Sequence, residues 1–123
     1  MNSKKRLLAI VNLIEKNKKV IDIGTDHGLV PLYLAKNDIS KEILATDISE
    51  NSLSKLVDSL DEETSKYIKT MVTDGFDGIK KDDNQVAIIA GMGANTIMEI
   101  IEKNLDFAQN LDYICLLYTS PSP

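Results

Sequence analysis

Hydrophobic residues in this chain form short continuous runs that alternate with amphipathic stretches. Runs such as Val86 to Ala90 contain no polar residue, which is typical of strands buried on both faces of a parallel sheet. The stretches between them place apolar residues three and four positions apart, which indicates helices with one buried face. The predicted strands are residues 19–23, 42–47, 68–72 and 86–90, with a fifth beginning at 112–114, and the predicted helices are 4–16, 27–36, 49–59 and 95–103.

Residues near the starts of these helices favour helix initiation. Ser3, Ser49 and Asn95 can each accept a hydrogen bond from the first helical turn, and Pro31 must lie in the first turn of its helix or kink it. The apolar positions that we expect to face the core are Leu7, Leu8, Ile10, Val11, Leu13 and Ile14 in the first helix and Leu53, Leu56, Val57 and Leu60 in and after the third.

The alternation of strands and helices predicts an α/β fold with a doubly wound parallel sheet. A length of 123 residues, 43% of them hydrophobic and 27% charged, suits a single packed domain. The apolar runs are far shorter than a membrane span requires, and no secretory signal is recognisable, so we expect a cytoplasmic protein. One cysteine, Cys115, and one histidine cannot supply a disulfide or a zinc site, so no metal is expected.

Charge is unevenly distributed along the chain. The net charge of −5 argues against a general nucleic-acid-binding protein, which needs clustered Lys and Arg. Residues 1–20 nevertheless hold six basic side chains and one acidic one. From the sequence, this basic end is the only surface that we expect to face an anion, although the same lysines could simply solubilise the first helix.

The residues that end the predicted strands suggest a ligand site, because ligands of such sheets bind outside the carboxyl ends of the strands. The first strand is followed by Gly24, and Asp47 ends the next strand 23 positions later, where an acid can accept both hydroxyls of a ribose. A nucleoside-containing cofactor is therefore expected. The candidate cofactor-binding residues are Asp22, Gly24, Thr25, Gly28, Asp47, Ile48, Asp74, Gly75, Gly91 and Met92.

The charge of these strand ends favours one class of cofactor. A dinucleotide fingerprint would need glycine where Asp26 and Leu29 stand, and no Lys-Ser or Lys-Thr follows the glycine turn as in a P-loop. S-adenosylmethionine carries a sulfonium and an ammonium but no phosphate, so the carboxylates of Asp22, Asp26, Asp47 and Asp74 suit it.

Several motifs together resemble a known enzyme family. They are Ser-Lys-Lys-Arg-Leu at 3–7, Val-Ile-Asp-Ile-Gly-Thr-Asp-His-Gly at 20–28, Asp74-Gly75, and Ile-Ala-Gly-Met-Gly at 89–93. With them, residues 3–114 resemble the Rossmann-like class I methyltransferases and, among these, the bacterial tRNA (adenine-22-N1)-methyltransferases. The resemblance implies methyl transfer to a ring nitrogen of adenosine in tRNA. It also implies cofactor contacts at Asp22, Gly24, Asp47, Asp74 and Gly91.

The candidate catalytic residues are Asp26 and His27. Gly91-Met92-Gly93 stands where enzymes that methylate exocyclic amines usually carry Pro-Pro-aromatic, so a ring nitrogen is the better target. Adenine N1 already has an in-plane lone pair, so the enzyme needs no strong base. It must position N1 in line with the methyl group and stabilise the positive charge that develops on the ring. Three alternatives stay open: a nucleoside- or RNA-binding module without catalysis, a small-molecule methyltransferase, and a nicotinamide-dependent oxidoreductase on the same architecture.

The last nine residues, 115–123, match a translated reading frame of a transposase adaptor used in sequencing libraries. We therefore expect a methyltransferase domain over 1–114 and a non-native tail over 115–123. The resemblance implies seven strands and a helical extension for tRNA, so tRNA is expected to bind mainly through a C-terminal region that is missing here. The basic first 20 residues are a second candidate for tRNA contact. The chain by itself is expected to be inactive, with an open sheet edge.

Overall fold

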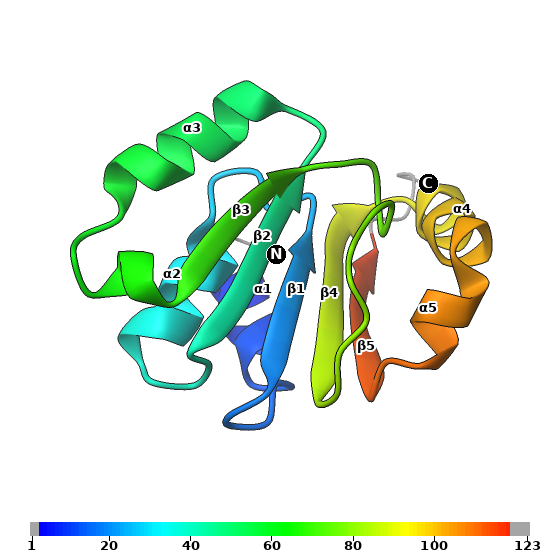
Figure 1. Cartoon of the computed structure of the whole chain (residues 1–123), viewed down its shortest axis with the longest axis horizontal. Coiled ribbons are helices and arrows are strands. Elements are labelled where there is room, and N and C mark those ends of the chain that lie inside the picture. The colour runs from blue at the N-terminus through cyan, green and yellow to red at the C-terminus, as the bar shows by residue number, and fades with distance from the viewer. Residues whose placement is uncertain (1–2, 119–123) are drawn as a thin grey trace.

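The computed structural model describes residues 3–118, which form a five-stranded parallel sheet with helices on both faces (Figure 1). The strand order is β3-β2-β1-β4-β5, which confirms the predicted doubly wound architecture. No helix in this range is long and apolar enough to cross a bilayer. The elements are α1 (Ser3–Val11), β1 (Lys19–Ile23), α2 (Leu29–Lys36), β2 (Glu42–Asp47), α3 (Glu50–Ser59), the 3-10 helix η1 (Thr64–Lys66), β3 (Ile68–Val72), β4 (Gln85–Met92), α4 (Ala94–Lys103), α5 (Leu105–Gln109) and β5 (Tyr113–Tyr118).

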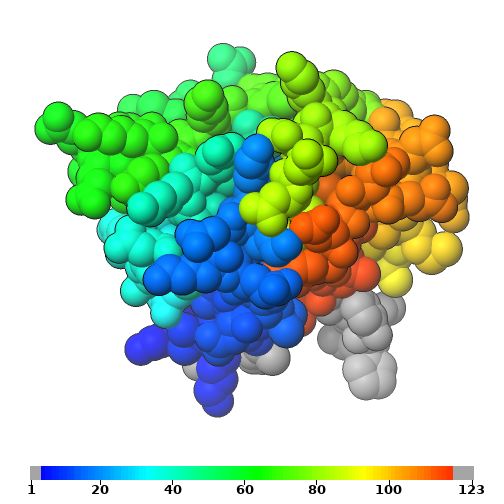
Figure 2. Space-filling view, turned by 60° about the horizontal axis from the view of Figure 1, so that its bottom comes forward, coloured from blue at the N-terminus to red at the C-terminus, as the bar shows by residue number. Residues whose placement is uncertain are grey.

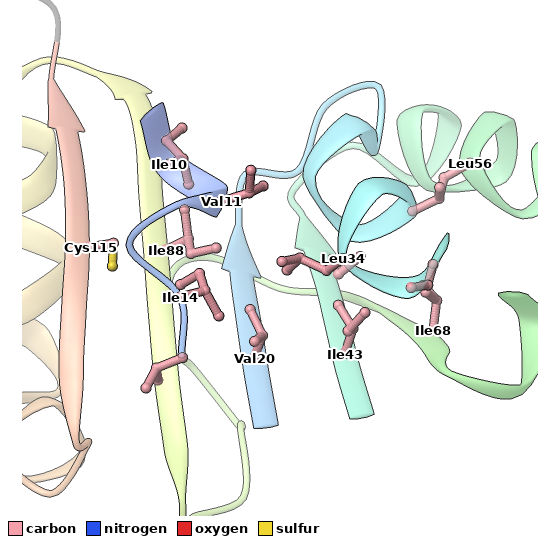
Figure 3. Close-up of a cluster of buried hydrophobic side chains, with 13 residues drawn as sticks. Ile10, Val11, Ile14, Val20, Leu34, Ile43, Leu56, Ile68, Ile88 and Cys115 are labelled. Carbon is pink, nitrogen blue, oxygen red and sulfur yellow. The ribbon is translucent and has the colours of Figure 1, made fainter. Parts of the chain in front are cut away.

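The sheet is apolar on both faces, because successive side chains of a strand point to opposite sides. Val20 belongs to a cluster packed against α1, α2 and α3, whereas the next residue, Ile21, belongs to a second cluster under α4 and α5. Figure 3 shows the first cluster, in which Leu34 lies near Val20 and Ile43, whereas Leu56 lies farther from β1, on the α3 side of α2. This double burial explains why the strands read as continuous hydrophobic runs.

The end of the first helix and the burial of two apolar side chains differ from the predictions. Helix α1 ends at Val11, not residue 16, because the amides of Leu13 and Ile14 bond to carbonyls three residues back and Asn17 then adopts a positive φ of 71°. The turn leaves Leu13 58% exposed, so its predicted core position is wrong. Val57 of α3 is also exposed rather than inward.

The starts of α2 and α4 differ by one or two residues from those predicted. Helix α2 begins at Leu29 because Gly28 adopts the left-handed conformation, which leaves His27 in the preceding turn; Pro31 lies in the first turn, as expected. Helix α4 begins at Ala94 after Gly93, and the predicted Asn95 cap is wrong. Helix α5 was not predicted, because five residues are too few to show a helical period.

The predicted cap of α3 is confirmed, because the amide of Ser52 donates to Oγ of Ser49 at 3.2 Å. Ser49→Ala should therefore lower the free energy of unfolding by about 1 kcal/mol in urea denaturation. Ser54→Ala, at an exposed position inside the same helix, is the matched control and should be neutral or slightly stabilising, since alanine favours helix. Equal stability of the two variants would contradict the capping role.

Strand β5 runs from Tyr113 to Tyr118 alongside β4, with Cys115 buried opposite Ile88. Burial raises the pKa of the Cys115 thiol. The sheet in this structure therefore includes the first residues of the expected non-native tail, whereas residues 119–123 and the side chain of Ser3 lie outside the described part. The domain boundary at residue 114 stays a prediction.

Candidate functional site

A cavity of about 590 Å³ lies at the carboxyl ends of the strands. It is lined by α1, by the ends of β1, β2 and β4, and by the loop after β3. Gly28 does not line the cavity. It caps the start of α2 with a positive φ of 71° and packs against Leu56. The other eleven candidates come together around the cavity: Asp22, Gly24, Thr25, Asp26, His27, Asp47, Ile48, Asp74, Gly75, Gly91 and Met92.

Asp22 forms the buried floor of this cavity. Its Oδ2 accepts a hydrogen bond from the Thr25 hydroxyl at 2.7 Å, and both residues are almost fully buried. The pKa of Asp22 is raised to about 7, chiefly by burial; the Thr25 hydrogen bond opposes this shift and the negative charge of Asp47 adds to it. The floor is therefore an acid whose charge can change near neutral pH.

Asp47 joins the loops that follow the first two strands. Its Oδ2 accepts from the amide of Asp26 at 3.0 Å, and its Oδ1 accepts from the amide of Ser49 at 2.9 Å. The amide of Thr25 also donates to the carbonyl of Thr46 at 2.8 Å. These bonds hold the β1–α2 loop in place, including Asp26 at a positive φ of 54° that Asp tolerates better than most residues.

Asp26 and His27 lie at the mouth of the cavity. Their side chains are 71% and 75% exposed, and His27 Nε2 is 3.7 Å from Asp26 Oδ2. Because neither is buried in the floor, both are accessible to a molecule that enters the cavity from solvent. Asp74, also exposed on the rim, lies 3.8 Å from Nζ of Lys103.

Two glycines keep the centre of the cavity open. Gly24 has a positive φ of 65° and lies against the methyl of Met92, so a side chain there would collide with it. Gly91 has a φ of 76° and lies beside the guanidinium of Arg6. A β-carbon at either position would be strained and would narrow the space above the strand ends.

Sequence reasoning missed part of the lining. From the sequence, Arg6 belongs to the basic amino terminus and to the motif at 3–7, but it is not among the candidate site residues, because its place in the cavity depends on α1 packing beside the strand ends. The remaining missed residues are mostly apolar or hydroxylic, types that carry no distinctive signal in one sequence. They are Leu7, Ile10, Ile23, Leu29, Val30, Ser52, Thr73, Ala90, Thr96 and Ile100.

The electrostatics of the cavity favour a cationic ligand that also carries hydroxyls. Four carboxylates line it, those of Asp22, Asp26, Asp47 and Asp74, against one guanidinium, that of Arg6, and no lysine is found among its described lining residues. Within residues 3–118, no group of three or more His, Cys, Asp and Glu side chains is arranged to hold a metal. A phosphate group would meet repulsion here, whereas an ammonium or sulfonium would be attracted.

Comparison with known proteins agrees with this chemistry. A family model described as a methyltransferase domain matches residues 3–121. The chain belongs to this methyltransferase domain family. It is 33% identical over 108 residues to a Mycoplasma genitalium protein named "Putative tRNA methyltransferase MG248", covering 85% of this chain and 49% of that protein.

Two further members of the methyltransferase family are similar. The Bacillus subtilis tRNA (adenine(22)-N(1))-methyltransferase is 28% identical over 103 residues, which cover 83% of this chain and 43% of that protein. The structure of TrmK from M. capricolum in complex with S-adenosylhomocysteine matches with a TM-score of 0.72 and 28% identity, covering 85% of this chain and 47% of that one. The chain thus spans about half the length of the curated relatives it matches.

Proposed function

We propose that the protein represented by this chain transfers a methyl group from S-adenosylmethionine to N1 of an adenosine in tRNA, and that residues 3–118 supply the cofactor half of the enzyme. The observation that carries the proposal is the cavity with four carboxylates from three successive strand ends, one guanidinium and no lysine among its described lining residues. Similarity to a methyltransferase bound to S-adenosylhomocysteine and to an adenine-22 N1-methyltransferase supports the cofactor and the target. A tRNA substrate implies a cytoplasmic enzyme.

The residues present fit the cofactor. When bound, S-adenosylmethionine supplies an electrophilic methyl group on a sulfonium. Asp47 would accept from the ribose hydroxyls, since its oxygens already lie at the end of β2 and are held by two amides. Asp22 and Gly24 would hold the methionyl end, and Asp74 with Gly75 the adenine end. Gly91 and Met92 would leave room for the reacting centre, while Thr25 and Ile48 complete the walls.

Asp26 and His27 are the residues that we propose for the acceptor base. They stand exposed at the mouth, where an adenine can be oriented without entering the cofactor floor. Methylation of N1 places positive charge on the ring, and the Asp26 carboxylate would stabilise it or accept a hydrogen bond from the N6 amine. No strong base is required, because the N1 lone pair is already free to attack.

Calorimetric titration of this chain with S-adenosylhomocysteine and, separately, with NAD tests the cofactor class. We expect binding of S-adenosylhomocysteine and none of NAD; the reverse would support the oxidoreductase alternative. Joining residues 1–114 to the remaining half of the Bacillus subtilis relative then allows methyl transfer to a tRNA transcript to be measured. A transcript with guanosine in place of adenosine 22 is the control, and equal labelling of both would overturn the proposed target.

Asp26→Asn is expected to lower the rate of methyl transfer in that completed enzyme by roughly ten-fold at saturating cofactor. The affinity for S-adenosylhomocysteine should change by no more than a few fold, because Asp26 lies at the mouth and Asn keeps the positive φ that the loop needs. Single-turnover kinetics and calorimetry measure the two effects. A parallel loss of cofactor affinity would assign Asp26 to the cofactor instead.

A further inference from the structure

A second cavity, of about 710 Å³, lies at the amino ends of β1, β2 and β3. The first cavity, which we call the acidic cavity after its four aspartates, lies at the opposite, carboxyl ends of the strands. Figure 2 shows this end of the molecule, where the blue, cyan and yellow-green segments that carry part of its lining gather on one face. Six of the fourteen basic residues of the chain line it, and we call this set the lysine groove: Lys19, Lys41, Lys66, Lys69, Lys80 and Lys81.

Strand register explains why the groove is open. Ile21, Leu44 and Lys69 are partners across β1, β2 and β3, so their side chains lie on the same face of the sheet. Helices α4 and α5 cover this face over β1 and β4. Over β2 and β3 this face is bordered by the connection 73–84, which contains no helix. The Gln85 side chain fixes the end of that connection, donating to the carbonyl of Lys80 at 3.1 Å and accepting from the amide of Asp82 at 2.8 Å.

The charge of the groove is only partly neutralised within the chain. Its two acidic lining residues, Glu42 and Asp82, both approach Lys19, at 3.9 and 2.6 Å, and the bond to Asp82 raises the pKa of that lysine. Within residues 3–118, none of the other five lysines forms an ion pair. Such a concentration of unpaired cations in a chain of net charge −5 is complementary to a polyanion.

We propose that the lysine groove binds the phosphate backbone of the RNA substrate, a proposal that rests on the proposed function. Lysines are mobile point charges that neutralise phosphates without reading sequence, and this suits a contact remote from the target base. Along β2, Glu42 in the groove and Asp47 in the acidic cavity are about 17 Å apart, a distance that one folded tRNA spans. Five of these lysines lie beyond the first 20 residues, so the proposal adds a second anion-facing surface to the basic amino terminus.

The test compares two double variants with the same change of charge. Lys69→Gln with Lys81→Gln neutralises two groove lysines that have no ion pair. Lys36→Gln with Lys55→Gln neutralises two exposed lysines on α2 and α3, outside the groove. Binding of a fluorescent tRNA transcript to the 123-residue chain is measured by anisotropy over a series of salt concentrations. Polyglutamate serves as the competing acidic polypeptide.

For the groove variant we expect tRNA affinity to fall roughly ten-fold or more, and the slope of log K against log salt to fall by about 1.5, as the loss of two phosphate contacts requires. The Lys36 and Lys55 variant should stay within two-fold of the wild type. Equal losses in both variants, no tRNA binding by the wild type, or groove-dependent binding of polyglutamate but not of tRNA would each overturn the proposal. Calorimetry with S-adenosylhomocysteine on the same samples shows whether each variant is folded. It also tests the proposed cofactor function independently of the groove, because the acidic cavity lies at the opposite ends of the strands.

Discussion

Asp47→Ala is expected to weaken the binding of S-adenosylhomocysteine by about 1.5 to 3 kcal/mol, which is roughly 10- to 150-fold in Kd. The carboxylate would lose its bonds to the ribose hydroxyls. It would also lose the two amide bonds, from Asp26 and Ser49, that hold the loops after β1 and β2 together. Calorimetry on the 123-residue chain measures the affinity, and urea denaturation measures how much stability the loops contribute.

Two variants separate the ligand contact from a general effect of charge. Asp47→Asn keeps one oxygen acceptor and should retain more affinity than Asp47→Ala. Asp58→Ala removes a carboxylate from an exposed position on α3 and should leave Kd unchanged. If Asp47→Ala binds the ligand as tightly as Asp58→Ala does, Asp47 has no place in the cofactor site.

The sheet was predictable from the sequence because its strands are buried on both faces. Runs such as Val86 to Ile89 are fully buried in the structure, and burial of this kind leaves a continuous apolar signature. Helix ends were less predictable. Leu13 and Ile14 fit the helical period of α1 equally well, yet only Ile14 is buried, because the turn to Asn17 interrupts the helix before either residue.

Positions in the candidate site were predictable where topology alone brings residues together. Parallel strands meet at one edge, so Asp22, Asp47 and Asp74 converge whatever the details of packing. Arg6 and the lysine groove depend instead on how separate elements pack. Lys41, Lys66 and Lys81 stand far apart in the chain and become neighbours only through strand order and the path of the β3–β4 connection.

The pKa of Asp22 leads to the second large effect, on the pH dependence of stability. Burial raises this pKa from 3.8 to about 7, so the folded state keeps the Asp22 proton to a higher pH than the unfolded chain does. Between about pH 4 and pH 7 the folded state therefore binds more protons, and the contribution of Asp22 to stability falls as pH rises. Above pH 7 both states have lost the proton and the contribution is constant.

Asp22→Asn removes this titration while keeping an oxygen that can accept from the Thr25 hydroxyl. The unfolding free energy of the variant, relative to the wild type, should rise from pH 4 to pH 7 and then level off. Its full span is on the order of 4 kcal/mol for a shift from 3.8 to about 7. Urea denaturation at pH 4.5, 6, 7 and 8.5 gives this difference at each pH.

Asp58→Asn, the same change at an exposed position, measures the effect of losing one surface charge and is subtracted. Because other titrating groups are shared by both proteins, their contributions cancel in the difference between variant and wild type. A difference that does not change between pH 4.5 and 8.5 would mean that Asp22 is ionised throughout this range. The floor of the cavity would then carry a fixed negative charge toward a cationic ligand, in place of one that appears only near neutral pH.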